Sequence, residues 1–220
     1  MKPTYIVFLY IGIVTCIACS TDDHTFKSRP YASPETGEVT EIAENGSMLH
    51  GEFFGVGTSP IKDYGFVYDQ QNEDIRIGIS ERVSLGTSIQ TRFSGVADHA
   101  LANGITCYYR AYAIVGDKNL TVYGNQKSFV PKGSLQPSIT EIVPSSGKQG
   151  DIIVINGSGF SDKLYGAEVK FGNLPAYVTK TSSKSITCTV PFLPPGDTDV
   201  VIKININNAL STAKKFTVTN

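Results

Sequence analysis

The chain has 220 residues, with 19 lysines and arginines against 20 aspartates and glutamates, and its formal net charge is -1 at pH 7. This length gives room for one large domain or for two of about 90 to 100 residues. Because no block of basic residues occurs, the sequence lacks the electrostatic footprint of nucleic-acid binding, and we expect no nucleic acid partner.

The first segment is an apolar run that is too short to cross a bilayer. It extends from Tyr5 to Ala18, whereas a spanning helix needs about 20 apolar residues. Lys2 precedes it, and small residues end it. This order predicts a signal peptide over residues 1–18.

The residues at the predicted cleavage point resemble the lipobox of bacterial lipoproteins. The motif is Cys16-Ile17-Ala18-Cys19, and Cys16 stands where that family usually has an aliphatic residue. The resemblance implies that Cys19 carries a diacylglycerol and becomes the mature N-terminus, with a plain secretory signal as the alternative. Lipid chains buried at about 0.8 kcal/mol per methylene would anchor the chain stably.

The residues after Cys19 indicate where such a lipoprotein would be found. The acidic stretch Ser20-Thr21-Asp22-Asp23 looks like the tether that some Gram-negative bacteria use to send lipoproteins to the outer leaflet. We therefore expect an outer-membrane protein that is lipid-anchored and surface-exposed, with the membrane as a partner through its lipid. A solvated acidic tail is the simpler alternative.

Beyond the signal, the composition is typical of an all-β protein. Threonine, valine, isoleucine, glycine and tyrosine dominate, and the periodicity of amphipathic helices is missing. We expect a flexible tether over residues 19–36, which contains Pro30 and Pro34. Short strand-like runs then recur from Gly37 with turns such as Asn45-Gly46 between them, which predicts a β-sandwich.

Residues 37–131 resemble the fibronectin type III-like modules of bacterial surface lipoproteins. The resemblance lies in the segment Asp63-Tyr64-Gly65-Phe66-Val67-Tyr68 and in a late strand within residues 101–113. Alternation along this late strand predicts two faces. The inward residues are Cys107, Tyr109, Ala111, Ala113 and Val115, and the outward residues are Tyr108, Arg110 and Tyr112.

A break at residues 130–134 separates these residues from a second domain, predicted over 135–220. Its glycine-rich run 150–160 and the later Pro194-Pro195-Gly196 turn resemble the IPT/TIG domain, which has an immunoglobulin-like fold. Alternation predicts ten inner-face residues: Ile153, Ile155, Phe160, Val169, Phe171, Val190, Ile202, Ile204, Phe216 and Val218. The predicted fold class is all-β, with two immunoglobulin-like or fibronectin III-like sandwiches in tandem.

The sequence offers no pattern that predicts catalysis. The histidines at 24, 50 and 99 lack metal-ligand spacing, and Gly157-Ser158-Gly159 lacks the neighbours of a nucleophile elbow. Cys107 and Cys188 stand in apolar strands of different domains, and we expect inert buried thiols. We therefore predict a protein that is not an enzyme, with no catalytic residue, cofactor or metal site.

Exposed aromatic residues remain as candidates for binding, because a rigid ring gives a large contact area at low entropic cost. The predicted ligand-binding residues are Tyr108, Tyr112 and Tyr123. The predicted function is that of a non-enzymatic cell-surface lipoprotein, a binding or spacer module in glycan capture or adhesion, with a polysaccharide or a surface protein as partner. The alternative is an auxiliary non-catalytic module of an extracellular carbohydrate-active enzyme system.

Overall fold

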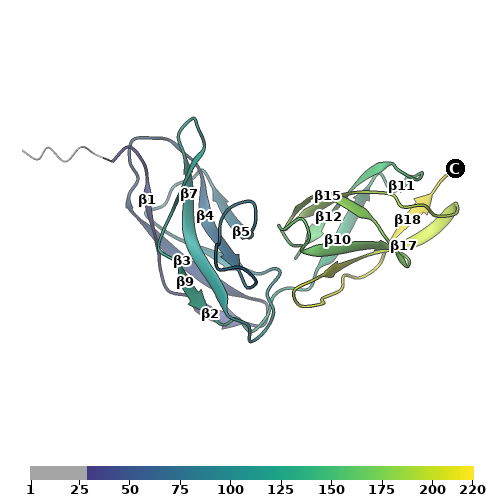
Figure 1. Cartoon of the computed structure of the whole chain (residues 1–220), viewed down its shortest axis with the longest axis horizontal. Helices are drawn as coiled ribbons and strands as arrows, with labels where there is room; N and C mark the ends of the chain where they lie inside the picture. The colour runs from purple at the N-terminus through teal and green to yellow at the C-terminus, as the bar shows by residue number, and fades with distance from the viewer. Residues whose placement is uncertain (1–28) are drawn as a thin grey trace, which may run out of the picture.

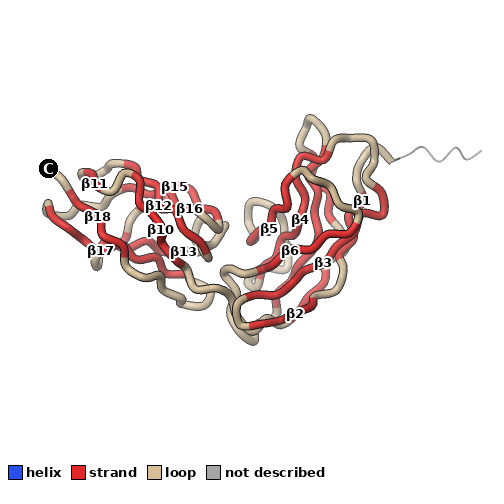
Figure 2. The backbone as a smooth tube through the Cα atoms, turned by 180° about the vertical axis from the view of Figure 1, so that it is seen from behind, coloured by secondary structure: helices blue, strands red, loops and turns tan. Residues whose placement is uncertain are grey.

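The structure is a computed structural model that describes residues 29–220. Over this range the chain forms strands joined by turns and loops, without a helix, which confirms the all-β prediction (Figures 1 and 2). Accordingly, none of the described residues forms a helix able to span a membrane. The predicted signal peptide, Cys19 and the first part of the predicted tether lie outside the described residues.

The first sandwich pairs a sheet built around one long strand with a second, larger sheet. In the first sheet, β3 (Gly46–Gly55) has β6 (Arg92–Ala97) on one edge and β1 (Ser33–Thr36) and β2 (Thr40–Ala43) on the other. The second sheet has the order β5 (Glu81–Gly86), β4 (Ile61–Asp69), β7 (Cys107–Val115) and β8 (Leu120–Tyr123), and β9 (Lys127–Phe129) also pairs with β7.

The second sandwich also consists of two sheets. One has the order β10 (Ser138–Val143), β12 (Ile152–Ser158), β16 (Ser185–Thr189) and β15 (Tyr177–Ser182). The other has the order β11 (Ser146–Gly147), β18 (Lys214–Val218), β17 (Gly196–Ile204), β13 (Ala167–Phe171) and β14 (Leu174–Pro175). The short β11 pairs with β18 in parallel, while the other strand pairs of this sandwich are antiparallel.

Each sandwich has its own hydrophobic core, and the alternation in the sequence predicted both. The five residues expected to point inward from β7 are all buried in the first core. The ten inner-face residues predicted for the second sandwich are likewise all buried in its core. These predictions are confirmed because each strand in question has one face packed against the opposite sheet.

The tether prediction is wrong at its C-terminal end, because β1 already belongs to the sandwich. Ala32 is buried, and Thr36 accepts a hydrogen bond from the backbone N–H of Ala111 at 2.9 Å through its hydroxyl. Pro34 fits β1 because this strand lies at a sheet edge, where a residue without an N–H donor is tolerated. The polar sequence around Pro34 indicated a tether only because this edge pairing was not visible in it.

The two sandwiches follow one another along the long axis of the molecule and meet at an angle (Figure 1). The described chain enters at the far end of the first sandwich and reaches its C-terminus at the opposite end of the second. At the junction, β5 and the loop after β6 lie next to the loop between β12 and β13 of the second sandwich (Figures 1 and 2).

Candidate functional site

The predicted binding face of the first sandwich is covered by its own chain. The segment between β4 and β5 crosses the outer surface of β7, and its Ile75 is fully buried. Tyr108 donates a hydrogen bond to Glu73 at 2.7 Å, and the Tyr123 hydroxyl accepts one from the backbone N–H of Ile77 at 3.0 Å. Both tyrosines are half-buried, and their hydroxyl groups hold this segment in place.

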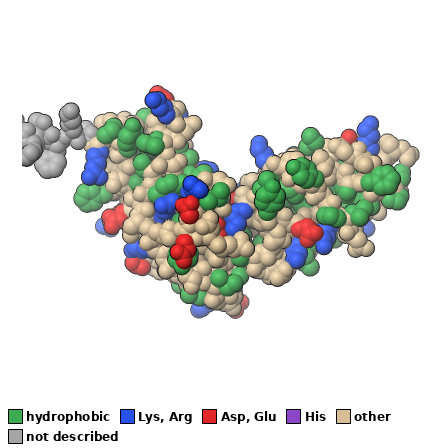
Figure 3. Space-filling view, viewed as in Figure 1, with side chains coloured by type: hydrophobic (Ala, Val, Ile, Leu, Met, Phe, Trp, Pro, Cys, Tyr) green, Lys and Arg blue, Asp and Glu red, His purple; other side chains and the backbone are tan. Residues whose placement is uncertain are grey.

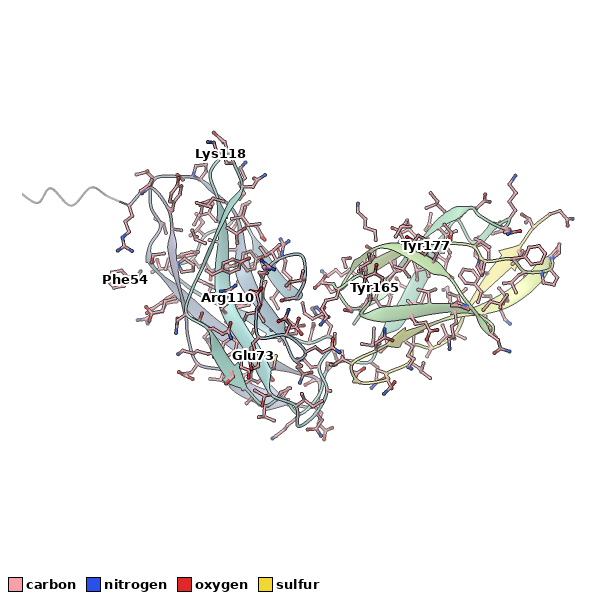
Figure 4. The ribbon with its side chains drawn as sticks, viewed as in Figure 1. Phe54, Glu73, Arg110, Lys118, Tyr165 and Tyr177 are labelled. Atoms are coloured by element: carbon pink, nitrogen blue, oxygen red, sulfur yellow. The ribbon has the colours of Figure 1, made fainter. Side chains whose placement is uncertain are left out.

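Arg110 strengthens the same attachment. Its guanidinium donates a hydrogen bond to the carbonyl of Ile75 and lies 3.9 Å from the centre of the Tyr123 ring, a cation–π contact. Figure 4 shows Arg110 and Glu73 on this face of the first sandwich. The residues predicted to bind a ligand here therefore bind a segment of the protein itself.

The expectation that Tyr112 is exposed is wrong, because its side chain is fully buried. Its hydroxyl donates a hydrogen bond to Asp63 and accepts one from Arg82 Nε at 2.8 Å, and the Arg82 guanidinium lies 5.4 Å from the ring centre. Burial and the hydrogen bond to Asp63 raise the pKa of Tyr112 well above its usual value. Tyr112 does point away from the core, but Arg82 of β5 covers it.

The two most exposed tyrosines of the described residues both lie on the second sandwich. The side chain of Tyr165 is 86% exposed and that of Tyr177 is 73% exposed. They line an open groove of about 350 Å³, together with Leu164, Ala167, Glu168, Ala176, Val178 and Asn205. Figure 4 shows the two tyrosines close to the junction, and Figure 3 shows hydrophobic side chains gathered on this part of the surface. We call this feature the tyrosine groove.

The backbone below Tyr165 is held firmly although its ring is exposed. The Asn205 side chain donates a hydrogen bond to the Tyr165 carbonyl at 2.8 Å, and the backbone N–H of Gly166 donates one to Lys163 at 2.8 Å. A Cβ on Gly166 would lie 1.8 Å from the buried Ser161 hydroxyl, so only glycine fits this turn. The groove is thus preformed in the protein.

The same loop attaches the second sandwich to the first. The Ser161 hydroxyl and the backbone N–H of Asp162 donate hydrogen bonds to the two carboxylate oxygens of Glu81, at 2.5 and 2.6 Å. Lys163 pairs with the buried Asp69 at 3.0 Å. Because Glu81 and Asp69 are both buried in the first sandwich, these contacts form part of a sealed junction.

His99 lies at the centre of this junction. Its Nε2 lies 3.0 Å from Asp162 Oδ2 and 3.7 Å from Glu81 Oε2, and its Nδ1 lies 2.9 Å from Asp98. Although burial favours the neutral ring, the hydrogen bonds with Asp162 and Asp98 raise the pKa of His99 to about 9. A doubly protonated imidazolium donates at both nitrogens, which matches carboxylates on its two sides.

The side chains of Glu81, His99 and Asp162 each offer one atom that lies within 4.8 Å of the others, a spacing also seen at metal sites. Here, however, the oxygens facing His99 already accept backbone hydrogen bonds. Glu81 Oε2 accepts one from Asp162 and Asp162 Oδ2 accepts one from Arg82, so the arrangement is explained by an ion pair. The sequence did not reveal this cluster, because Glu81 and Asp162 are 81 positions apart.

A second hollow lies on the first sandwich, over the outer face of β3 and β6. It has a volume of about 430 Å³ and is lined mainly by polar and charged residues, among them Glu38, His50, Glu52, Arg92 and Lys127. It carries no exposed aromatic ring, since its single aromatic residue, Phe93, is buried. The tyrosine groove is therefore the better candidate for stacking against a ligand.

The prediction that both cysteines are buried thiols is confirmed. Cys107 and Cys188 are both buried and neither forms a disulfide. Burial raises the pKa of the Cys188 thiol to about 12 and that of Cys107 still further. Thiols this hard to ionise are poor nucleophiles at neutral pH.

Comparisons with known proteins match parts of this chain. Human fibrocystin-L is 36% identical over 75 residues and mouse fibrocystin-L 31% identical over 98 residues, which cover 34% and 42% of this chain. The chain spans about 2% of the length of these curated relatives. Their similarity therefore concerns one module of a much longer protein.

Among solved structures, an auxiliary nutrient binding protein from Bacteroides thetaiotaomicron aligns at 24% identity and a TM-score of 0.36, over 39% of this chain and 21% of that one. The SGBP-B protein from a complex xyloglucan utilization locus of Bacteroides uniformis aligns at 15% identity and a TM-score of 0.32, over 81% and 48%. Scores this low establish no shared function.

The sequence profile of the IPT/TIG domain matches residues 137–218, from just before β10 to the end of β18. This range coincides with the second sandwich and its core. The second sandwich of the chain is therefore an IPT/TIG domain with an immunoglobulin-like fold.

Proposed function

We propose that this chain is a non-enzymatic cell-surface lipoprotein that binds a glycan in the tyrosine groove. The observation that carries the proposal is the pair of exposed rings, Tyr165 and Tyr177, that line one groove together with the apolar side chains Ala167, Ala176 and Val178. Apolar faces of sugar rings stack on such side chains. Glu168 and Asn205 line the same groove and offer groups that can hydrogen-bond to hydroxyls.

The shape of the groove favours binding over catalysis. It is open to solvent, and its apolar floor consists of the small side chains Ala167, Ala176 and Val178. Water exclusion and a pair of facing catalytic groups are what a hydrolase would require, and Glu168 is the groove's single carboxylate. An open groove instead suits a chain that lies across the surface and continues beyond it.

The anchoring part of the proposal comes from the sequence. Acylation of Cys19 would attach the chain to the outer membrane, and residues 20–28 would connect the lipid to the first sandwich. We propose that this sandwich is a fibronectin type III-like module, which its strand orders β1/β2-β3-β6 and β5-β4-β7-β8 support. In this arrangement the first sandwich lies between the lipid and the tyrosine groove and keeps the groove away from the membrane.

The binding proposal is tested by affinity electrophoresis of residues 20–220 through gels containing single polysaccharides. We expect retardation in at least one gel, and we expect Tyr165→Ala and Tyr177→Ala each to weaken it by about 1 kcal/mol or more, as the loss of a contact ring would. Phe54→Ala is the matched control, since Phe54 is 88% exposed but lies on the first sandwich. Equal retardation of all four proteins would exclude the groove.

The same set of polysaccharide gels distinguishes a binding protein from a spacer, an auxiliary module or an enzyme. A chain that no polysaccharide retards acts as a spacer or as an auxiliary module of an enzyme system. Turnover of any polysaccharide by the purified chain would show an enzyme. Anchoring is tested separately with Cys19→Ala in the full chain, which should leave an unprocessed or mislocalised precursor; normal processing with membrane retention would exclude a lipoprotein.

A further inference from the structure

We infer that His99 locks the two sandwiches into one rigid unit and, through the loop that carries Asp162, holds Tyr165 in place at the tyrosine groove. Only the effect on the groove rests on the proposed function; the lock itself does not.

Groups from its own loop, from β5, from β4 and from the second sandwich lie against the side chain of His99. Asp98 comes from its own loop, Glu81 from β5 and Asp162 from the second sandwich. From β4, the Tyr68 ring packs against the imidazole with 5.5 Å between centres, and its hydroxyl donates to the His99 carbonyl at 2.8 Å.

The other charges around the junction are paired, so they do not replace His99. Lys163 pairs with Asp69 of β4 at 3.0 Å, and Arg82 pairs with Asp63. His99 is therefore the cation that faces Glu81 of its own sandwich and Asp162 across the boundary between the sandwiches. Its side chain is 5% exposed, so solvent screens this pairing poorly.

Loss of the His99 charge would turn attraction into repulsion. A neutral ring that keeps its proton on Nδ1 for Asp98 would present an Nε2 lone pair to the carboxylates of Asp162 and Glu81. The buried carboxylate of Glu81 and the partly buried carboxylate of Asp162 would then lie together without a facing cation, which is unfavourable. The second sandwich would then be held by Lys163, by the hydrogen bonds between β5 and the loop of Ser161 and Asp162, by that of Asn207 to the Leu101 carbonyl, and by the chain between β9 and β10.

The loop of Asp162 transmits this lock to the groove. Only Lys163 and Leu164 separate Asp162 from Tyr165, and Gly166 closes the turn against Ser161. A small cavity of about 50 Å³ lies between the sandwiches and is lined by residues of both, including Glu81, Lys163 and Tyr165. Because so little space is free, the loop cannot shift toward the first sandwich while the lock is closed.

The lock is tested by pulsed electron spin resonance on residues 20–220 with spin labels at Lys118→Cys and Thr212→Cys, two exposed positions on different sandwiches. Cys107 and Cys188 are buried and should stay unlabelled. We expect a narrow distance distribution at pH 7. With His99→Gln the distribution should broaden clearly, while His50→Gln, at a half-buried histidine on β3 that lies away from the junction, should leave it unchanged.

A titration of the protein with native His99 needs no substitution at the junction. The distribution should broaden as the pH rises from 7 to 10, and this broadening should be absent from the already broad His99→Gln variant. A distribution that stays narrow in His99→Gln or at pH 10 would overturn the lock. A lock that opens with EDTA and closes again with Zn²⁺ would also overturn it, in favour of a metal site.

The effect of the lock on the tyrosine groove is measured as retardation of the protein in a polysaccharide gel. His99→Gln should lower retardation severalfold and His50→Gln should not, while the spin labels report opening in the same samples. If the distribution broadens but retardation is unchanged, the lock does not position Tyr165. If no polysaccharide retards the protein with native His99, the proposed function fails, and the spin labels still decide the lock.

Discussion

Tyr112 donates its hydroxyl proton to Asp63, and this pair is buried on the outer side of the sheet, away from the sandwich core. Asp63 also accepts hydrogen bonds from Arg82, from the Ser84 hydroxyl at 2.6 Å and from the backbone N–H of Gly86 at 3.1 Å. One carboxylate thus ties β4 to β5 and to β7. The pair therefore serves the stability of the sheet.

We expect Tyr112→Phe to lower the free energy of unfolding by about 1 to 3 kcal/mol, because it leaves a buried carboxylate with one donor fewer. Urea denaturation measures this change. Tyr108→Phe is the control, since its hydroxyl bonds to the exposed Glu73 and its loss should cost much less. If the two substitutions cost the same, the Asp63 network contributes nothing beyond a surface contact.

The stability of the protein should fall as the pH rises above neutral. Burial raises the pKa of Glu81 to about 7, although the charge of His99 opposes this, and the pKa of His99 is raised to about 9. Since the folded chain holds both protons more tightly than the unfolded chain, Glu81 loses its contribution between about pH 4.5 and 7 and His99 between about pH 6.5 and 9.

We therefore expect a lower urea midpoint at pH 9.5 than at pH 6.5, with most of the difference due to His99. In His99→Gln the two midpoints should lie much closer together. A midpoint in the unsubstituted protein that rises between these pH values would contradict the assigned direction of the His99 shift.

The thiols should be unreactive until the protein unfolds. Cys107 and Cys188 are buried, and burial raises the pKa of each. A thiol-specific chromogenic reagent added to residues 20–220 at pH 8 should report no fast thiol in the folded protein and two equivalents in 6 M guanidinium chloride. Rapid reaction of one equivalent without denaturant would identify an accessible cysteine.

The turn at Gly166 should not tolerate a larger residue. Gly166→Ala places a methyl group against the Ser161 hydroxyl, which bonds to Glu81, and we expect a loss of about 1 to 3 kcal/mol from this overpacking. Gly55→Ala is the matched control, because no atom lies within 4 Å of the added Cβ. Thermal unfolding of both variants checks the difference, and equal midpoints would show that the turn can relax.

The sequence predicted the cores well because a strand with one buried face alternates with period two, and this signal is local. Ile153, Ile155 and Tyr109 were placed correctly on that basis. The prediction that Tyr112 is exposed was wrong. Alternation indicates on which side of the sheet a residue lies, but it does not indicate what covers that side. The cover is Arg82 of β5, a strand that the sequence analysis did not predict.

The candidate site was predicted poorly for a related reason. The rings of Tyr165 and Tyr177 come together only through the packing of β13, β15 and the loop before β13, which no local pattern encodes. The local sequence contains only weak indications of a binding site: Tyr165 precedes a glycine, and Tyr177 is the first residue of the polar run YVTKTS. The junction around His99 left no local signal, since its partners come from three separate segments.

The place of β18 determines how the molecule would respond to a pull on its two ends. β18 lies between β11 and β17, so its backbone is bonded on both sides, and it runs parallel to β11. A force along the strand would load many of these hydrogen bonds together in shear. Peeling a strand from a sheet edge breaks them one after another at lower force. A pull applied to the C-terminal end of β18 would therefore meet hydrogen bonds on both sides of that strand.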